Sequence, residues 1–169
     1  MKTILILTMH GMPPKDFPRR EIGEYFSLHM LMENSPQRMD EQQRQRYAQL
    51  NEQVRSYPRA AANDPFYFNS QDMARRLASE TGLETLVCFN EFCNPSMADA
   101  ARAAVEHGAQ RIIVLTPMMT RGGDHAEEDI PAELETLQKT YPEVEFRYAW
   151  PFDPDEVTRF LAGQVSRFA

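Results

Sequence analysis

The sequence has few cysteines and no excess of positive charge, and each shortage excludes a class of protein. Its two cysteines, Cys88 and Cys93, are too few for a disulfide framework, and their spacing differs from the Cys-x-x-Cys of zinc and redox sites. We therefore expect two reduced thiols near a buried strand. The 18 basic and 25 acidic residues give a net charge of −7, so we expect no nucleic-acid partner, because phosphate contacts need a basic surface.

Long apolar runs and nucleotide-binding motifs are also absent. The stretch Ile4–Leu7 is too short for the apolar segment of a secretion signal, and no run approaches the ~18 residues of a membrane span. We therefore expect a cytoplasmic protein with no membrane partner. The glycine-rich phosphate-binding motifs, His-Glu-x-x-His and Gly-x-Ser-x-Gly do not occur, so we expect neither a nucleotide cofactor nor a serine hydrolase.

The 169 residues are the length of one domain, and the pattern of apolar residues indicates an α/β fold. Near-continuous apolar runs are typical of buried parallel strands, and four are predicted, at Thr3–Met9, Thr85–Phe89, Arg111–Thr116 and Val144–Ala149. Helical spacing and capping signals predict helices at Ser70–Gly82, Ser96–Gly108, Ile130–Tyr141 and Val157–Phe168. This alternation predicts a roughly four-stranded parallel sheet with right-handed crossovers.

One connection is too long for a single crossover. More than seventy residues separate the first two strands, although the helix Ser70–Gly82, with Met73 and Leu77 facing inward, would suffice. We therefore expect residues 12–65 to be a helical insertion within a single domain that spans 1–169. Two helices are predicted in it, at Glu21–Asn34 and at Asp40–Tyr57, the second with a narrow apolar seam. We expect them to form an arm that covers the domain.

Polar side chains follow three of the predicted strands. His10 comes directly after the first strand, Glu91 after the second, and His125 a few residues after the third. Because ligands of open α/β sheets bind beyond the carboxyl ends of the strands, we expect these side chains to converge. Two imidazoles and a carboxylate suit a divalent transition metal, and they can also accept protons near neutral pH. We interpret the other histidines, His29 and His107, as structural or surface residues.

These residues lie in segments that resemble a known family. The segments are His10-Gly11, Phe89-Asn90-Glu91 with Pro95-Ser96, and Gly123-Asp124-His125-Ala126-Glu127-Glu128-Asp129-Ile130-Pro131-Ala132. They resemble the CbiX/SirB sirohydrochlorin chelatases, and the resemblance covers residues 1–11 and roughly 66–165.

The resemblance implies a chelatase-like fold, of which this chain is a three-layer half. It also implies ATP-independent insertion of a divalent metal (Co²⁺, Fe²⁺ or Ni²⁺) into sirohydrochlorin or a related tetrapyrrole, in the biosynthesis of cofactors such as cobalamin or sirohaem. By this resemblance His10, Glu91 and His125 are both the metal ligands and the catalytic residues.

The implied substrate carries many carboxylates, which a net charge of −7 would repel. The basic residues nearest the expected site in the sequence are Lys15, Arg19, Arg20 and Arg121. A planar guanidinium can bind a carboxylate through two hydrogen bonds. We therefore expect Arg19, Arg20 and Arg121 to bind the substrate carboxylates, the alternative being a surface cluster that pairs with acidic neighbours.

Two other functions fit part of the pattern. A histidine phosphatase also places His-Gly after its first strand, but it needs an arginine just before the histidine, where this chain has Met9. A non-catalytic metal-binding or metal-delivery protein needs the same three ligands without a cleft for a macrocycle. Such a cleft must be wide and apolar. Met118, Met119 and Phe89 could line it, or they could pack in the core.

We predict that the protein is a homodimer. About four strands make this chain resemble half of a two-lobed chelatase, and short members of the family pair two such halves. A two-fold pair would bury one self-complementary face of typically ~800 Å² on each partner, and the inserted arm is a candidate for this face. Light scattering at high protein concentration should give twice the 19.5 kDa of one chain, and a monomer mass would contradict the prediction.

Overall fold

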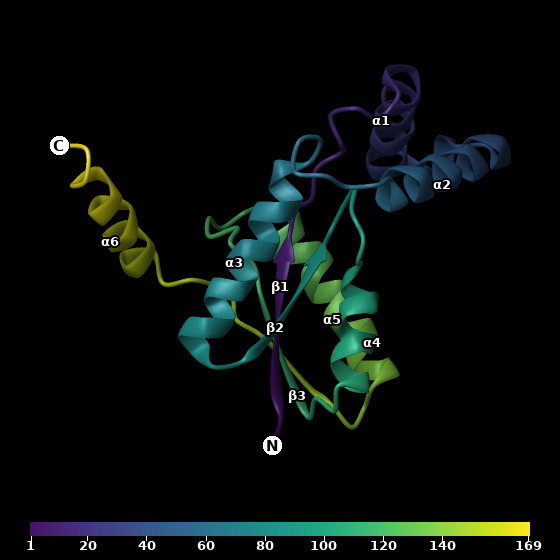
Figure 1. The fold of residues 1–169 in the computed structure, drawn as a ribbon. Coiled ribbons are helices and arrows are strands. Elements are labelled where there is room, and N and C mark those ends of the chain that lie inside the picture. The colour runs from purple at the N-terminus through teal and green to yellow at the C-terminus, as the bar shows by residue number, and fades with distance from the viewer.

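A four-stranded parallel sheet forms the centre of the protein. The computed structural model describes residues 1–169, with β1 (Thr3–Met9), β2 (Glu84–Phe89), β3 (Arg111–Leu115) and β4 (Glu145–Tyr148) in the order β2-β1-β3-β4 (Figure 1). Strand β1 is almost entirely buried, because it pairs with β2 on one side and with β3 on the other. The predicted fold class is confirmed, and no strand end differs from its predicted position by more than one residue.

Helices cover both faces of the sheet and make three layers (Figure 1). α3 (Pro65–Thr81) packs on one face, and α4 (Met97–Glu106) and α5 (Ile130–Thr140) pack on the other. Right-handed crossovers explain this division, because the chain steps in one direction from β1 to β2 and in the opposite direction from β2 to β3 and β4. The larger core lies under α4 and α5, where alanines such as Ala101 and Ala104 allow α4 to approach the sheet closely.

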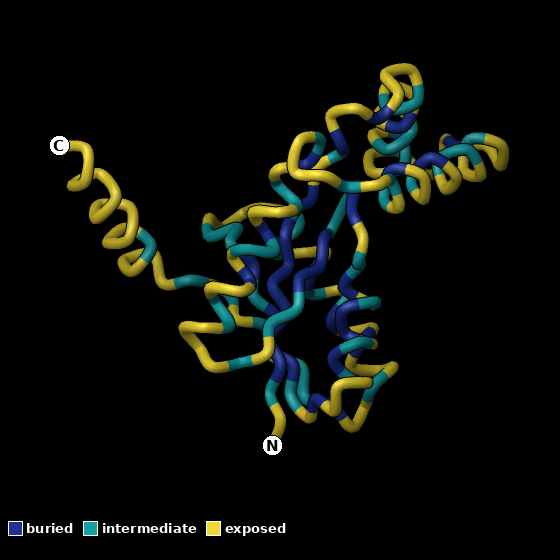
Figure 2. Tube along the Cα trace, viewed as in Figure 1, coloured by how far each residue is buried: buried dark blue, intermediate teal, exposed yellow.

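A helical hairpin occupies most of residues 12–65. α1 (Arg19–Asn34) and α2 (Glu41–Ser56) are joined through a short 3₁₀ turn, η1 (Pro36–Arg38). The apolar seam predicted for the second helix is confirmed, since Leu50 and Val54 are fully buried in a small cluster of their own. The hairpin stands at the carboxyl edge of the sheet and covers neither face of it, which differs from the expected covering arm (Figures 1 and 2).

Several placements differ from the sequence-based expectations. α3 begins at Pro65, five residues before Ser70, because the Asp64 side chain accepts a hydrogen bond from the first turn. Met73 of α3 was expected to face inward but is 46% exposed. The last helix, α6 (Pro154–Val165), forms as predicted, yet none of its residues is buried, and it projects away from the sheet (Figures 1 and 2). None of the helices combines the length and the apolar character needed to span a membrane.

A buried ion pair joins the hairpin to the loops that follow β1 and β2. The guanidinium of Arg59 lies 2.7 Å from the carboxylate of Asp64, and the two side chains are 8% and 1% exposed. Arg59 also donates hydrogen bonds to the backbone carbonyls of Met12, Val54 and Phe92. These carbonyls belong to the loop after β1, to α2 and to the loop after β2, so one side chain holds three segments together.

We predict that Asp64→Ala destabilises the fold by about 3–5 kcal/mol, because it leaves the buried charge of Arg59 without its partner. Urea unfolding followed by circular dichroism measures the loss. Asp72→Ala is the matched control, since Asp72 is 42% exposed and pairs only with Arg75 and Arg76 at the surface of α3. That control should lose no more than ~1 kcal/mol. Similar losses in the two variants would contradict the prediction.

Candidate metal centre

A close backbone contact brings the ends of β1 and β2 together. Gly11 has a φ of +98°, and a Cβ atom at this position would lie 1.9 Å from the carbonyl oxygen of Glu91. Glycine is therefore required here both by the dihedral angle and by the available space. The amide of Glu91 donates a hydrogen bond to the carbonyl of His10 at 2.8 Å. Main-chain contacts thus hold His10 and Glu91 side by side.

The side chains of His10, Glu91 and His125 converge at the carboxyl edge of the sheet, where the sequence placed them. One ligand atom of each residue lies within 4.8 Å of the others. Nε2 of His10 is 3.7 Å from Oε2 of Glu91, and the rings of His10 and His125 meet edge to face at 4.9 Å between centroids. Atoms that bind one ion at ~2.0–2.2 Å lie roughly 3–4 Å apart, so small side-chain rotations would bring all three onto one ion.

Each imidazole of the cluster is oriented through its Nδ1 atom. Nδ1 of His10 lies 2.9 Å from the carbonyl oxygen of Gly11, and Nδ1 of His125 lies 2.6 Å from a carboxylate oxygen of Asp129. A hydrogen on Nδ1 leaves a lone pair on Nε2, which is the form of histidine that binds a metal ion. His125 and Asp129 are the first and last residues of a π-helical turn, η2 (His125–Asp129), which directly precedes α5. This turn brings their side chains together.

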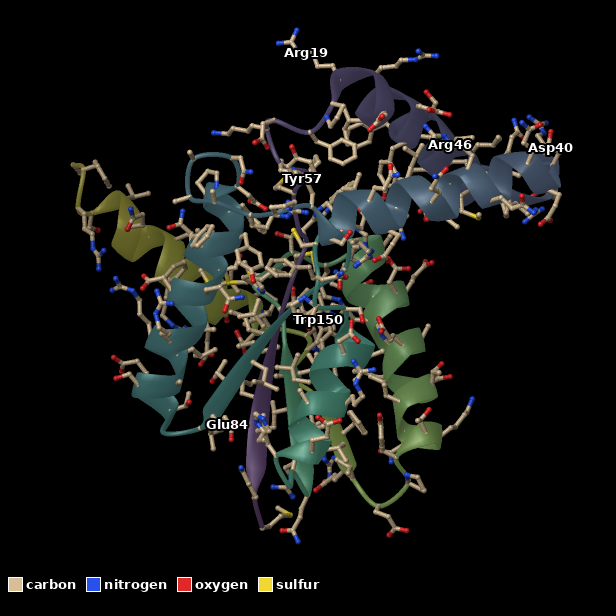
Figure 3. All side chains as sticks on the ribbon, turned by 45° about the vertical axis from the view of Figure 1, so that its right-hand side comes forward. Arg19, Asp40, Arg46, Tyr57, Glu84 and Trp150 are labelled. Carbon is tan, nitrogen blue, oxygen red and sulfur yellow. The ribbon has the colours of Figure 1, made fainter.

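His29 belongs to the site, although its sequence position indicated a structural or surface role. The hairpin brings Nε2 of His29 to 3.0 Å from Oε1 of Glu91. His29 does not follow a strand, so its position in the sequence could not place it at the sheet edge. The contact depends on where the hairpin meets the sheet. His107 is a surface residue as expected, and it pairs with Glu84 at the opposite end of the sheet (Figure 3).

Two polar cavities adjoin the cluster. The larger, of about 530 Å³, opens beside Glu91 and His125, and the smaller, of about 230 Å³, lies between the hairpin and the sheet edge. Their walls are rich in carboxylates, which come from Glu33, Glu91, Asp124, Glu128, Asp129 and Glu133.

The expected apolar cleft is not found at this edge. Met118 lines the larger cavity, but Phe89 is 1% exposed and stacks on Tyr67 in the core. Met119 lines neither cavity. The walls around the cluster are acidic instead, and walls of this charge attract cations.

The arginines expected to bind substrate carboxylates lie outside both cavities. Arg19 and Arg20 begin α1, whose other end, Asn34, lines the larger cavity about 22 Å away along the helix axis. Arg19, at the start of α1, points away from the rest of the chain (Figure 3). Arg121 is 66% exposed and forms an ion pair with Glu127 at 2.5 Å. Arg19 and Arg20 are close to His10 in the sequence but not in space. The chain runs away from the site after His10, and the later residues of α1 return to it.

Burial changes the acidity of groups around the smaller cavity. It raises the pKa of the Glu133 carboxyl, and the Ala98 amide and the Arg55 guanidinium offset this only in part. Burial also raises the pKa of the Tyr25 and Tyr47 phenols, so both are protonated at neutral pH and can donate hydrogen bonds.

The arrangement as a whole suits a divalent transition metal. Two imidazoles and one carboxylate supply the nitrogen and oxygen ligands that such ions prefer, and three protein ligands leave positions for a second molecule. His10 and His125 are 43% and 26% exposed, so the cluster is accessible from outside. The same groups can accept protons from a molecule bound there.

Comparisons with known proteins find similarity to chelatases. Residues 66–165 match the model of the CbiX family. The chain is 39% identical over 70 residues to a sirohydrochlorin ferrochelatase of Priestia megaterium, and 33% identical over 69 residues to a sirohydrochlorin cobaltochelatase of the same organism. Each alignment covers 41% of this chain, but only 26% and 22% of the two relatives, so the chain matches about a quarter of their length.

A solved structure has the same fold. The structure of SirB from Bacillus subtilis with Fe³⁺ aligns with a TM-score of 0.50 at 16% identity. The alignment covers 89% of this chain and 40% of that one.

We predict that Glu133→Gln raises the melting temperature at pH 7 and that the gain fades as the pH falls to 4. Burial raises the pKa of this carboxyl in the folded protein, so at neutral pH the fold carries a partly buried charge that glutamine lacks. Below the usual carboxyl pKa of about 4.5 the group is neutral in both states and the difference vanishes. Thermal melts at both pH values measure it. Glu135→Gln, exposed on the same helix, is the control. A gain of equal size at pH 4 would contradict the stated cause.

Proposed function

The chain belongs to the CbiX family, and from this premise we propose that it is an ATP-independent metal chelatase. The proposed reaction inserts Co²⁺, Fe²⁺ or Ni²⁺ into sirohydrochlorin or a related tetrapyrrole, as a step towards a cofactor of the cobalamin or sirohaem type. The matched family region includes Glu91 and His125, and the two relatives from Priestia megaterium are named for this reaction with iron and with cobalt.

The convergence of His10, Glu91 and His125 is the observation that carries this proposal. Three residues far apart in the sequence place one potential ligand atom each within 4.8 Å of the others. Each lies beyond the end of a different parallel strand, at the edge where open α/β sheets bind their ligands. A chelatase must hold its metal ion where a flat ring can approach it, and an accessible sheet edge meets this requirement.

Metal insertion exchanges one divalent cation for two protons of the macrocycle. Bonds from the ion to the ring nitrogens form as its bonds to the protein break, and two pyrrole N–H bonds release their protons to bases nearby. We assign two tasks, binding the ion and accepting these protons, to the imidazoles of His10 and His125 and to the carboxylate of Glu91. They first bind the ion in place of part of its hydration shell, and each can take up a proton once its bond to the ion is broken.

The acidic walls of the larger cavity support the first half of this reaction. Carboxylates such as Asp124 and Glu128 surround the approach to His125 and raise the local concentration of cations. No arginine or lysine lines this cavity. The histidine-phosphatase alternative needs a cation that holds a phosphate beside His10, but the charged side chain that faces Nε2 of His10, at 3.7 Å, is the acidic Glu91.

A metal-delivery protein is the second candidate, and one observation favours it. Only 2 of the 11 residues that line the larger cavity are hydrophobic, whereas a macrocycle calls for broad apolar contact. Delivery would use the same three ligands and transfer the ion to another protein without inserting it.

We predict that His10→Ala and His125→Ala abolish metal insertion and leave the fold intact, because neither side chain belongs to the buried core. Glu91→Gln should weaken metal binding and slow insertion, because a neutral amide is a poorer ligand and base. The absorbance of sirohydrochlorin after addition of Co²⁺ or Fe²⁺ follows the reaction. His107→Ala, at the opposite end of the sheet, is the control.

Near-normal insertion by His125→Ala would show that the site is wrongly assigned. The same assay separates the two candidate functions. Repeated turnover by the wild-type protein supports the chelatase, whereas tight Co²⁺ binding without insertion supports delivery.

A further inference from the structure

His29, in α1 of the hairpin, contacts the metal centre directly. Its Nε2 lies 3.0 Å from Oε1 of Glu91, and the two side chains are 15% and 17% exposed. The other carboxylate oxygen, Oε2, faces Nε2 of His10 at 3.7 Å. The two oxygens of Glu91 therefore have separate partners, one in the hairpin and one in the metal cluster.

The ring of His29 is held in one orientation. Its Nδ1 lies 3.0 Å from the hydroxyl of Tyr47 in α2. The ring stacks on Tyr25 with 5.5 Å between centroids and 9° between planes, and on Tyr47 with 5.9 Å and 22°. Phe92 meets it edge-on at 6.1 Å. Contacts at both nitrogens and with three aromatic rings keep Nε2 directed at Glu91.

The hydrogen bonds around His29 have a defined direction. An ionised carboxylate can only accept, so the contact with Oε1 of Glu91 calls for a hydrogen on Nε2 of His29, and Nδ1 of the neutral ring then accepts from the Tyr47 hydroxyl. This hydrogen bond uses one lone pair of Oε1 and holds the carboxylate in one orientation. Glu91 is left to bind the ion through Oε2, the oxygen that already faces His10.

We propose that His29 is a positioning residue that fixes the Glu91 carboxylate for metal binding, so that the inserted hairpin completes the metal centre. This inference rests on the proposed metal site and extends it from the sheet edge to α1 and α2. Groups that hydrogen-bond to a metal ligand typically change metal affinity or activity 10–100-fold when they are removed. We expect an effect of this size from His29.

The test is the affinity of the full chain for Co²⁺ alone, measured by isothermal titration calorimetry. His29→Phe keeps the aromatic packing but removes the N–H donor, and the Kd for Co²⁺ should rise ~10–100-fold. His29→Gln places an amide N–H near the position of Nε2 and should restore most of the affinity. His107→Phe is the matched control, because it removes a close histidine–glutamate contact, that of His107 with Glu84, which lies away from the metal centre. The Kd of this variant for Co²⁺ should equal that of the wild type.

Two readouts separate positioning from a general effect on folding. In a Glu91→Ala background, His29→Phe should cause no further loss of Co²⁺ affinity, because His29 acts through Glu91. The visible absorption of bound Co²⁺ should also differ between His29→Phe and the wild type, because the freed carboxylate can bind in another mode. If His29→Phe does not fold, Tyr47→Phe decides the question, since it removes the donor to Nδ1 and should also weaken Co²⁺ binding.

A folded His29→Phe variant with the wild-type Kd, or an equal further loss in the Glu91→Ala background, overturns the proposal. The result is independent of turnover, because the probe is the metal alone. A wild-type protein that binds Co²⁺ without inserting it refutes the chelatase function and leaves the role of His29 standing. Normal insertion by the wild type together with full Co²⁺ affinity in His29→Phe refutes only the role of His29.

Discussion

The buried ion pair of Arg59 and Asp64 is the contact on which the geometry of the metal centre depends. A guanidinium has five N–H donors in a rigid plane, so after pairing with Asp64 it can still bind backbone carbonyls in several directions. In this protein those carbonyls belong to the loop that follows His10, to α2, and to the loop that follows Glu91. The two charges have side chains less than a tenth exposed, and they are tolerated because they pair with each other and because the terminal nitrogens of Arg59 also bind these three carbonyls, although its Nε has no partner. Arg55 adds a second clamp, since it donates to the carbonyls of Asn90 and Cys93 on either side of Glu91 and Phe92.

The loop after β2 carries the strain that this arrangement requires. Phe92 has a φ of +58°, a conformation that bulky residues rarely adopt, and its side chain is only 5% exposed. Its ring packs against His10 at 5.9 Å and against Tyr25 at 5.8 Å, so aromatic burial offsets the strained backbone. Because of this backbone conformation, the side chain of Glu91 faces the metal cluster while that of Phe92 packs in the apolar cluster of the hairpin. The loop after β2 thus supplies both a candidate metal ligand, Glu91, and an aromatic residue of the hairpin core, Phe92.

The charge around the site favours only one of the two molecules of the proposed reaction. The carboxylates around the two cavities favour a divalent cation and oppose an anionic macrocycle, and the net charge of −7 acts in the same sense. Arg55 in the wall of the smaller cavity binds backbone carbonyls, and the arginines expected to bind substrate carboxylates lie at the start of α1 or are paired at the surface. Several of the exposed apolar residues, such as Phe160 and Phe168, lie in and just after α6, away from the metal centre.

The sequence alone determined the sheet and the three residues at its edge, because both follow from local pattern. Buried parallel strands are continuous apolar runs, and the segments that follow them begin at the carboxyl edge, which is why His10, Glu91 and His125, each in such a segment, were expected to lie together. The position of the hairpin was decided only by tertiary structure. Its helices and apolar seam are periodic and therefore predictable, but the direction in which it leaves the sheet depends on contacts distant in sequence, such as Arg59 with Phe92. For this reason the contact of His29 with Glu91 could not be read from the chain, and the arginines that begin α1 lie a helix length of about 22 Å from Asn34, the end of α1 that lines the larger cavity.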